Sequence, residues 1–364
     1  MIYVTKPTLP DIQDYTNLMK GIWERGWLTN NGVLVQQLEN QLKQYLEVGN
    51  LSLVTNATMG LLLALYALDL EGEVITTPFT FAATTNVLFM KGLTPVFADI
   101  DPETFNIDPA DVERKITKKT SAILAVHVFG NPCDITGLEK IAKKHKLKLI
   151  FDAAHAFGVQ YKGKSVCEYG DVSVLSFHAV KLFNTVEGGA IVAKTEQISH
   201  KCKLFRNFGF ESEEEIVLPG VNAKMSEFHA AMGLCNLKSI KRVIDKNRKY
   251  FDLYVRLMDG ANVRFQKPEI SRVVHTYMPV CFDSKITRDK VYDHLVKNGY
   301  SSRKYFYPLT SDFDYLHTKN KKKKVSNNLI NARKVADTIL CLPLYPSMEK
   351  RDIEKICKLV KEIC

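Results

Sequence analysis

Short apolar runs alternate with stretches of helical periodicity over the first two thirds of the chain. The apolar runs predict strands at residues 73–76, 94–97, 122–128 and 148–151. The intervening periodic stretches predict helices at residues 108–115 and 138–145. This alternation indicates βαβ units and a mostly parallel sheet. We therefore expect a large α/β domain over residues 1–236, with helices that flank a central sheet.

The pattern changes near residue 237. An amphipathic helix rich in Lys and Arg is expected over residues 237–258, and shorter strands and helices follow it. This change predicts a smaller C-terminal α+β domain over residues 237–364, joined to the first domain by that helix.

Composition narrows the class of protein. The chain has 364 residues, of which 46% are hydrophobic and 25% are charged, and this is ordinary for a globular protein large enough to form two domains. Its net charge of +10 is scattered, and no nucleic-acid-binding motif is visible, so we expect no nucleic-acid partner. The excess of positive charge fits a nucleotide diphosphate substrate. For the densest basic run, residues 319–324, a solvated loop is favoured over a diphosphate clamp.

The sequence gives no indication of a membrane, a metal or a disulfide framework. The first residues lack a basic region followed by a long apolar stretch, so no signal peptide is expected. No run is apolar for the length of a membrane span, so we expect a cytoplasmic protein. The eight cysteines show no close paired spacing, which argues against a zinc site and against a disulfide framework.

Lys181 is the best candidate for covalent chemistry. It follows the apolar run 171–175 and precedes the step Gly188-Gly189, which leads into the apolar run 190–193. Its amine is therefore expected on a loop between two strands. A lysine that is partly desolvated, or close to another cation, loses its proton near neutral pH and can form a Schiff base with a carbonyl. A loop lysine that points into water is the ordinary alternative.

Asp152 ends an apolar run, residues 147–151, upstream of the lysine. Buried carboxylates are costly unless paired, and open α/β sheets bind their ligands at the C-terminal ends of strands. An aspartate there suits a cofactor with a pyridine nitrogen, because the carboxylate keeps that nitrogen protonated. An N-cap for a following helix is the alternative, and the two roles are compatible.

A turn of small polar residues around Thr58 separates a short apolar run, residues 51–54, from a helical run, residues 61–68. Such a turn leaves free backbone N–H groups at the positive end of a helix, and this suits a phosphate. A plain helix cap at Thr58 is an equal alternative.

The lysine, the upstream aspartate and the phosphate-type turn occur in the order of a fold-type I pyridoxal-phosphate enzyme, and further motifs extend the match. These motifs are Trp27-Leu28-Thr29-Asn30, residues 77–84, residues 95–101, residues 126–132, Asp152-Ala153-Ala154-His155, residues 176–189, residues 220–226 and Leu342-Pro343-Leu344-Tyr345. With them the chain resembles the DegT/DnrJ/EryC1/StrS family of nucleotide-sugar aminotransferases over nearly its whole length. The resemblance implies the fold-type I aminotransferase fold.

The resemblance also implies roles for single residues. Lys181 matches the lysine that holds pyridoxal 5′-phosphate as an internal aldimine, and Asp152 matches the partner of the pyridine nitrogen. Phe81 matches the aromatic residue that stacks on the cofactor ring. The positions that bind the cofactor phosphate are matched by the backbone at Ala57 and by Thr58 and Ser176.

Three further positions lie within the motifs. Asn222 matches a residue that reaches the neighbouring subunit's phosphate, so the resemblance implies a homodimer with shared active sites; a helix cap before Ser226 is the alternative. His155 and His178 are equally compatible with a helper role and with plain packing.

The resemblance implies transamination, with glutamate as the amino donor and a nucleotide-linked keto sugar as the acceptor. A histidine at the lysine position would indicate a dehydratase, and this chain keeps Lys181. The sequence around the lysine, together with residues 130–134, is similar to that of enzymes that convert dTDP-4-keto-6-deoxy-D-glucose to dTDP-4-amino-4,6-dideoxy-D-glucose for bacterial O-antigen or glycan synthesis. A C3 aminotransferase, a UDP-sugar C4 aminotransferase and a non-catalytic regulatory relative that binds a sugar nucleotide remain alternatives.

Overall fold

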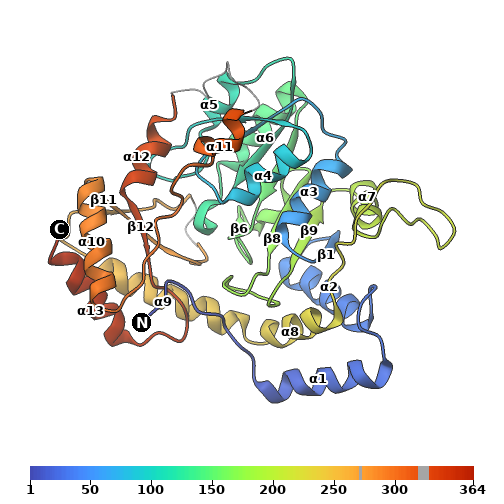
Figure 1. The fold of residues 1–364 in the computed structure, drawn as a ribbon, viewed down its shortest axis with the longest axis horizontal. Helices are drawn as coiled ribbons and strands as arrows, with labels where there is room; N and C mark the ends of the chain where they lie inside the picture. Colours follow the sequence, from blue (N-terminus) through green and yellow to red (C-terminus); the bar gives the residue numbers. More distant parts are fainter. Residues whose placement is uncertain (270–272, 319–327) are drawn as a thin grey trace.

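A seven-stranded sheet forms the centre of the computed structural model, which describes residues 1–269, 273–318 and 328–364 (Figure 1). The strand order is β1-β9-β8-β5-β4-β2-β3. Strand β9 runs antiparallel to both of its neighbours, and all other neighbours are parallel. The strands are β1 (Leu51–Val54), β2 (Glu73–Thr76), β3 (Thr94–Phe97), β4 (Thr120–Val126), β5 (Lys148–Asp152), β8 (Val172–Ser176) and β9 (Gly189–Ala193). The expected α/β fold with a mostly parallel sheet is confirmed.

Helices cover both faces of this sheet, and each face has its own apolar core. One core lies under α3 (Ala57–Ala67), α4 (Ala82–Met90) and α7 (Glu196–Arg206). The other lies under α1 (Ile12–Arg25), α2 (Val33–Leu46), α5 (Pro109–Arg114), α6 (Ile135–His145) and α8 (Glu227–Leu237). Successive strand residues serve opposite cores: Ile123 belongs to the second and Leu124 to the first, and both are fully buried. The strands therefore appear in the sequence as continuous apolar runs.

A second, antiparallel sheet of the order β10-β11-β12 lies beside the first (left in Figure 1). We call it, with its helices, the three-stranded unit. It contains α9 (Ile240–Leu257), β10 (Val263–Phe265), β11 (Met278–Phe282), α10 (Lys285–Lys297), α12 (Ile330–Thr338), β12 (Ile339–Leu342) and α13 (Lys350–Lys361). The remaining elements are the short hairpin β6 (Gln160–Tyr161) and β7 (Lys164–Ser165), α11 (Asp314–Thr318), and the short 3-10 helices η1 (Val128–Gly130), η2 (Val166–Glu168) and η3 (Thr310–Asp312). The division of the chain into domains at residues 236 and 237 stays a prediction.

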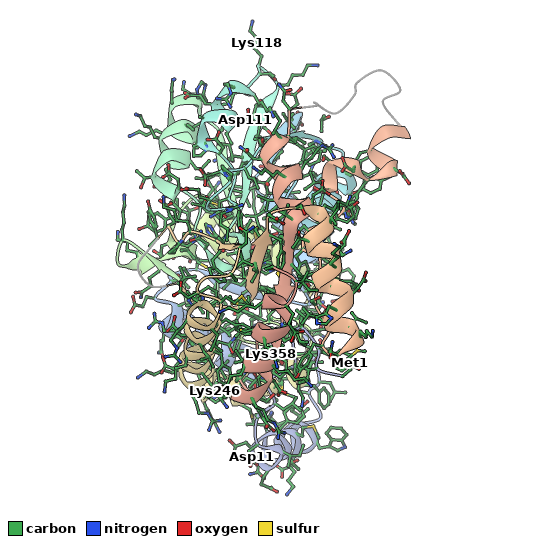
Figure 2. All side chains as sticks on the ribbon, turned by 90° about the vertical axis from the view of Figure 1, so that its left-hand side faces the viewer. Met1, Asp11, Asp111, Lys118, Lys246 and Lys358 are labelled. Carbon is green, nitrogen blue, oxygen red and sulfur yellow. The ribbon has the colours of Figure 1, made fainter. Side chains whose placement is uncertain are left out.

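The first residues of the chain pack on the three-stranded unit. The Ile2 backbone N–H donates to the carbonyl of Gly299 at 2.9 Å, and Leu344 N–H donates to the carbonyl of Val4 at 3.0 Å. In Figure 2, Met1 accordingly lies on the same side of the molecule as Lys358 of α13.

Several expected elements begin or end at other residues in the structure, and the cause is visible for two of them. The helix expected over residues 237–258 begins at Ile240, because the helical conformation is interrupted just before it. There the Ser239 hydroxyl donates to the carbonyl of Asn236 at 3.3 Å. The strand expected to reach residue 128 ends at Val126, because Phe129 adopts a left-handed conformation with φ of 58° in a tight turn. The basic run 319–324 lies outside the described residues.

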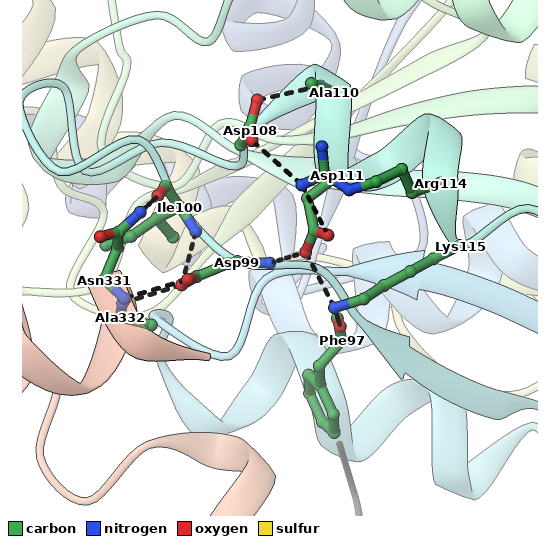
Figure 3. A network of polar contacts seen from close by, with 10 residues as sticks. All are labelled: Phe97, Asp99, Ile100, Asp108, Ala110, Asp111, Arg114, Lys115, Asn331 and Ala332. Carbon is green, nitrogen blue, oxygen red and sulfur yellow. Dashed lines mark hydrogen bonds and ion pairs between the residues drawn. The ribbon is translucent and has the colours of Figure 1, made fainter. Parts of the chain in front are cut away.

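Asp99, just after β3, joins the sheet to the three-stranded unit (Figure 3). Its carboxylate accepts the backbone N–H groups of Asn331 and Ala332, at 2.9 and 2.8 Å, in the first turn of α12. Its own N–H donates to Asp111 at 2.6 Å, and Asp111 forms an ion pair with Lys115 at 2.8 Å. The residue before α12 makes no side-chain cap, so Asp99 satisfies this helix start from outside the helix.

Charged side chains such as Lys118, Lys246 and Lys358 project from the surface (Figure 2). Across the described ranges, each helix is too short or too polar to cross a bilayer.

Candidate active site

A cavity of about 430 Å³ opens at the C-terminal ends of β4, β5 and β8. Asp152 and Ser176, the last residues of β5 and β8, line it, as does the N-terminal turn of α3. Residues of the three-stranded unit and its flanking loops form the opposite wall, among them Tyr277 and Arg303. The cavity thus lies where parallel α/β sheets bind their ligands.

Lys181 lies on the loop between β8 and β9, and its amine points into the cavity. The Nζ atom donates to the hydroxyl of Tyr277 at 3.5 Å. Burial lowers the pKa of Lys181 to about 8, against the attraction of Asp152 and with help from the charge of Arg303. The ordinary alternative, a lysine that points into open water, does not describe Lys181, because its amine lies in the cavity and burial lowers its pKa.

Asp152 is buried, and both carboxylate oxygens have partners. Oδ2 accepts the hydroxyl of Thr84 at 2.7 Å, and Oδ1 accepts the N–H of Ala154 at 3.1 Å. Burial raises the pKa of Asp152, while these two hydrogen bonds and the charge of Lys181 oppose the rise. No helix follows between residues 153 and 159, so the N-cap alternative for Asp152 is wrong.

The N-terminus of α3 also faces the cavity. Asn56 is its N-cap, and the Asn56 side chain accepts the N–H of Met59 at 2.9 Å, so the alternative that Thr58 caps the helix is wrong. The backbone N–H groups of Ala57 and Thr58 belong to the first turn, which has no acceptors within the helix. Gly189 lets β9 pass close by, since a Cβ there would lie 2.8 Å from the nitrogen of Ala57.

Phe81 precedes α4 and lines the cavity with a ring that is 53% exposed. His155 is buried, and its Nδ1 accepts the N–H of Phe129 at 3.2 Å. Burial lowers the pKa of His155 well below its usual value, and the charge of Lys181 adds to this, so the imidazole is neutral. His178 is exposed, and its Nε2 lies 3.6 Å from Glu187 Oε1. Both histidines thus line the cavity, one neutral and buried and one at its mouth.

Asn222 is absent from the cavity lining of this chain. It lies between α7 and α8 and forms an isolated bridge with Asn207. The N-cap of α8 is Ser226, whose hydroxyl accepts the N–H of His229, so a capping role for Asn222 is wrong. Its contact with a second subunit stays a prediction.

Several lining or supporting residues were not predicted as site residues from the sequence, among them Thr84, Tyr277, Arg303 and Tyr305. Thr84 stands inside one of the motifs, but only the fold shows that its hydroxyl meets Asp152. The others come from segments far along the chain. The aromatic run Tyr305-Phe306-Tyr307 beside Arg303 is the signal in the sequence that points to a binding wall.

These groups form a complementary set. The α3 N-terminus suits a phosphate, the carboxylate of Asp152 suits a ring nitrogen that carries a proton, and the amine of Lys181 suits an aldehyde carbon. The exposed ring of Phe81 suits a flat ring. The residues present therefore fit pyridoxal phosphate.

Comparison with known proteins agrees with this set of residues. The model of the DegT/DnrJ/EryC1/StrS aminotransferase family matches residues 11–361. A protein of Shigella dysenteriae named dTDP-4-amino-4,6-dideoxy-D-glucose transaminase is 40% identical over 368 residues, which cover 100% of this chain and 99% of that protein. The structure of DesI in the presence of its TDP-sugar product superimposes with a TM-score of 0.93 at 35% identity, over 99% of this chain and 92% of that one. NtdA of Bacillus subtilis, solved with the cofactor PMP, gives a TM-score of 0.86 at 26% identity over 97% and 81% of the two chains.

Proposed function

The chain belongs to the DegT/DnrJ/EryC1/StrS aminotransferase family, whose members depend on pyridoxal phosphate, and we propose that it moves an amino group from glutamate to C4 of dTDP-4-keto-6-deoxy-D-glucose. The product would be dTDP-4-amino-4,6-dideoxy-D-glucose, a precursor of O-antigen or other bacterial glycans. The observation that carries the choice of sugar is the 40% identity, over the whole chain, with the Shigella protein of that name. The structural likeness to DesI with its TDP-sugar product supports a thymidine-linked substrate.

Bound pyridoxal phosphate would supply an electrophilic carbon and an electron-withdrawing ring. Lys181 contributes an Nζ whose pKa of about 8 leaves it able to accept a proton at neutral pH, and this makes it the base for the donor's α-carbon. Thr84 and Ala154 hold the carboxylate of Asp152 in one orientation, in which it would pair with the protonated ring nitrogen.

The other lining groups position the reactants. The N–H groups at Ala57 and Thr58 and the hydroxyl of Ser176 line the cavity and would anchor the phosphate. Phe81 would cover one face of the ring. A cofactor anchored by its phosphate and by its ring nitrogen would be fixed in place, and this restricts the distance over which a proton must move at Lys181.

We also infer that the active unit is a homodimer in which Asn222 contacts the partner's phosphate. The segment around Asn222 exposes several large apolar side chains, a pattern typical of an interface: Phe208, Phe210, Ile216, Val217 and Val221. Mixing Asn222→Ala with Lys181→Ala should give hybrid dimers with one intact site and partly restored activity. Hybrids with no activity beyond that of the parents would contradict shared sites.

The deciding experiment for the substrate is to incubate the purified protein with glutamate and a panel of dTDP- and UDP-linked 4-keto and 3-keto sugars, and to identify products by mass spectrometry and NMR. We expect a 4-amino sugar from the dTDP-linked 4-keto-6-deoxy sugar. Preference for a 3-keto or UDP-linked sugar would refute the proposed substrate and keep the aminotransferase. Absence of turnover on every member of the panel would favour a regulatory relative.

A further inference from the structure

Arg303 is a second cation in the lining of the cavity, and the reaction described so far gives it no role. Its backbone is paired with β12, since Arg303 N–H donates to Cys341 O at 3.0 Å and Cys341 N–H donates to Arg303 O at 2.8 Å. Its guanidinium lies 4.3 Å from the centre of the Tyr305 ring. A strand pairing and an aromatic face thus hold the charge in the wall opposite the sheet.

The wall is continuous from this guanidinium to the reactive amine. The Tyr305 ring packs edge-on against Tyr277, with centres 5.5 Å apart, and the Tyr277 hydroxyl accepts from Lys181 Nζ. After burial, and against the pull of Asp152, the charge of Arg303 helps to lower the pKa of Lys181. The charges of Lys181 and Arg303 therefore both affect the same part of the cavity.

Two other arginines, unlike Arg303, are held by carboxylates. Arg206 pairs with Glu39 at 2.9 Å, and Arg333 pairs with Asp312 at 2.8 Å. No carboxylate within residues 1–269, 273–318 or 328–364 forms an ion pair with Arg303, and its side chain is exposed. Its guanidinium rests against Tyr305 and, within these ranges, lacks a carboxylate partner, so it can bind an anion that enters the cavity.

The chemistry of the two substrates indicates which anion this is. An α-amino acid carries its carboxylate on the same carbon as the reacting amine, so a cation near Lys181 is close to that carboxylate. A nucleotide sugar carries its diphosphate on C1, across the ring from a reacting C4. A cation near the amine therefore suits the donor better than the sugar nucleotide.

We propose that Arg303 binds the α-carboxylate of the amino donor and so determines that the donor is an α-amino acid. This assignment rests on the proposed aminotransferase function. Arg303 would thus contribute to the half-reaction in which the amino donor gives up its amine. It would contribute little to the half-reaction in which the keto sugar is aminated.

The test measures the two half-reactions separately on the holoenzyme by the change in cofactor absorbance, with glutamate for one half and the dTDP-linked 4-keto sugar for the other. Loss of the ion pair in Arg303→Gln should slow the glutamate half about 100-fold, while the sugar half changes by less than about threefold. Arg303→Lys, which keeps the charge, should recover part of the glutamate rate. Lys304→Gln is the matched control, because it removes a neighbouring positive charge outside the cavity and should leave both halves unchanged.

Equal losses in both halves, or a larger loss in the sugar half, would overturn the assignment and indicate a structural role or a contact with the diphosphate. A wild-type protein that transfers no amino group from glutamate would overturn the proposed function, and the assignment with it. A wild type active in both halves, with an Arg303→Gln variant equally active, would overturn the assignment alone.

Discussion

The two walls of the cavity are built differently. The sheet wall carries Asp152, Ser176 and Lys181 at or just after strand ends, and each carboxylate oxygen of Asp152 accepts one hydrogen bond within the protein. The opposite wall carries Tyr277 and Arg303, and the guanidinium there has no carboxylate partner in the described chain. This difference suits the sheet wall to a cofactor that stays bound. It suits the opposite wall, whose guanidinium lacks a carboxylate partner among the described residues, to substrates that bind and leave.

The largest effect is expected on the sheet wall, from Lys181→Ala. Removing the amine removes both the covalent attachment and the base, so activity should fall by at least about 10³-fold. Borohydride reduction followed by peptide mapping should find the cofactor on Lys181 in the wild type and on no lysine in the variant. Lys194→Ala, an exposed lysine just after β9, should behave as wild type. Cofactor found on another lysine would refute the role of Lys181.

Asp152→Asn should rank second. The amide keeps the shape and much of the hydrogen bonding but lacks the charge that stabilises a protonated ring nitrogen, so kcat/KM should fall by about 100-fold. Equilibrium dialysis should also show weaker retention of the cofactor. Retention and activity like those of wild type would show that this carboxylate is only structural.

Thr84→Val tests whether the hydrogen bond from Thr84 to Asp152 matters for activity. Because it removes one buried hydrogen bond to a carboxyl group, kcat/KM should fall by only about tenfold. The hydrogen bond from Thr84 opposes the rise in the pKa of Asp152, so its loss raises that pKa further. The acid limb of the kcat/KM profile should therefore move to higher pH. Thr85→Val is the matched control, because the Thr85 hydroxyl donates to Thr310 instead. Identical profiles for the two variants would contradict the role of Thr84.

The smallest effect concerns how the two walls are held together. Asp99→Ala removes the cap on α12 and should lower the free energy of unfolding by about 1–2 kcal/mol, whereas Asp99→Asn, which still accepts N–H donors, should lower it less. Urea unfolding of both variants measures the difference. Equal losses would show that the charge, and not the cap, provides the stabilisation.

The contrast between the walls also explains what the sequence could predict. Asp152 and Lys181 each follow an apolar strand, and strand ends of a parallel sheet meet at one edge, so local patterns were enough to predict them. The sheet, its strands and the order of elements were predicted for the same reason. Which residues face a second subunit, as expected of Asn222, depends on contacts that one chain does not contain.

Tyr277, Arg303 and Tyr305 could not be found in this way. They reach the cavity only because β11 and β12 pair in a separate sheet that packs against the first, and such packing leaves no short-range pattern. The break between α8 and α9 was missed because hydrophobic periodicity continues through Ser239, while a side-chain hydrogen bond ends the first helix.

The attachment of residues 2–4 has a consequence for biosynthesis. Their partners, Gly299 and Leu344, leave the ribosome roughly 300 residues later. The first residues therefore cannot form these hydrogen bonds until most of the chain has been translated. The seven-stranded sheet, by contrast, is complete once β9 at residues 189–193 has emerged. The sheet wall can thus assemble during synthesis, and the opposite wall is the last part of the enzyme to mature.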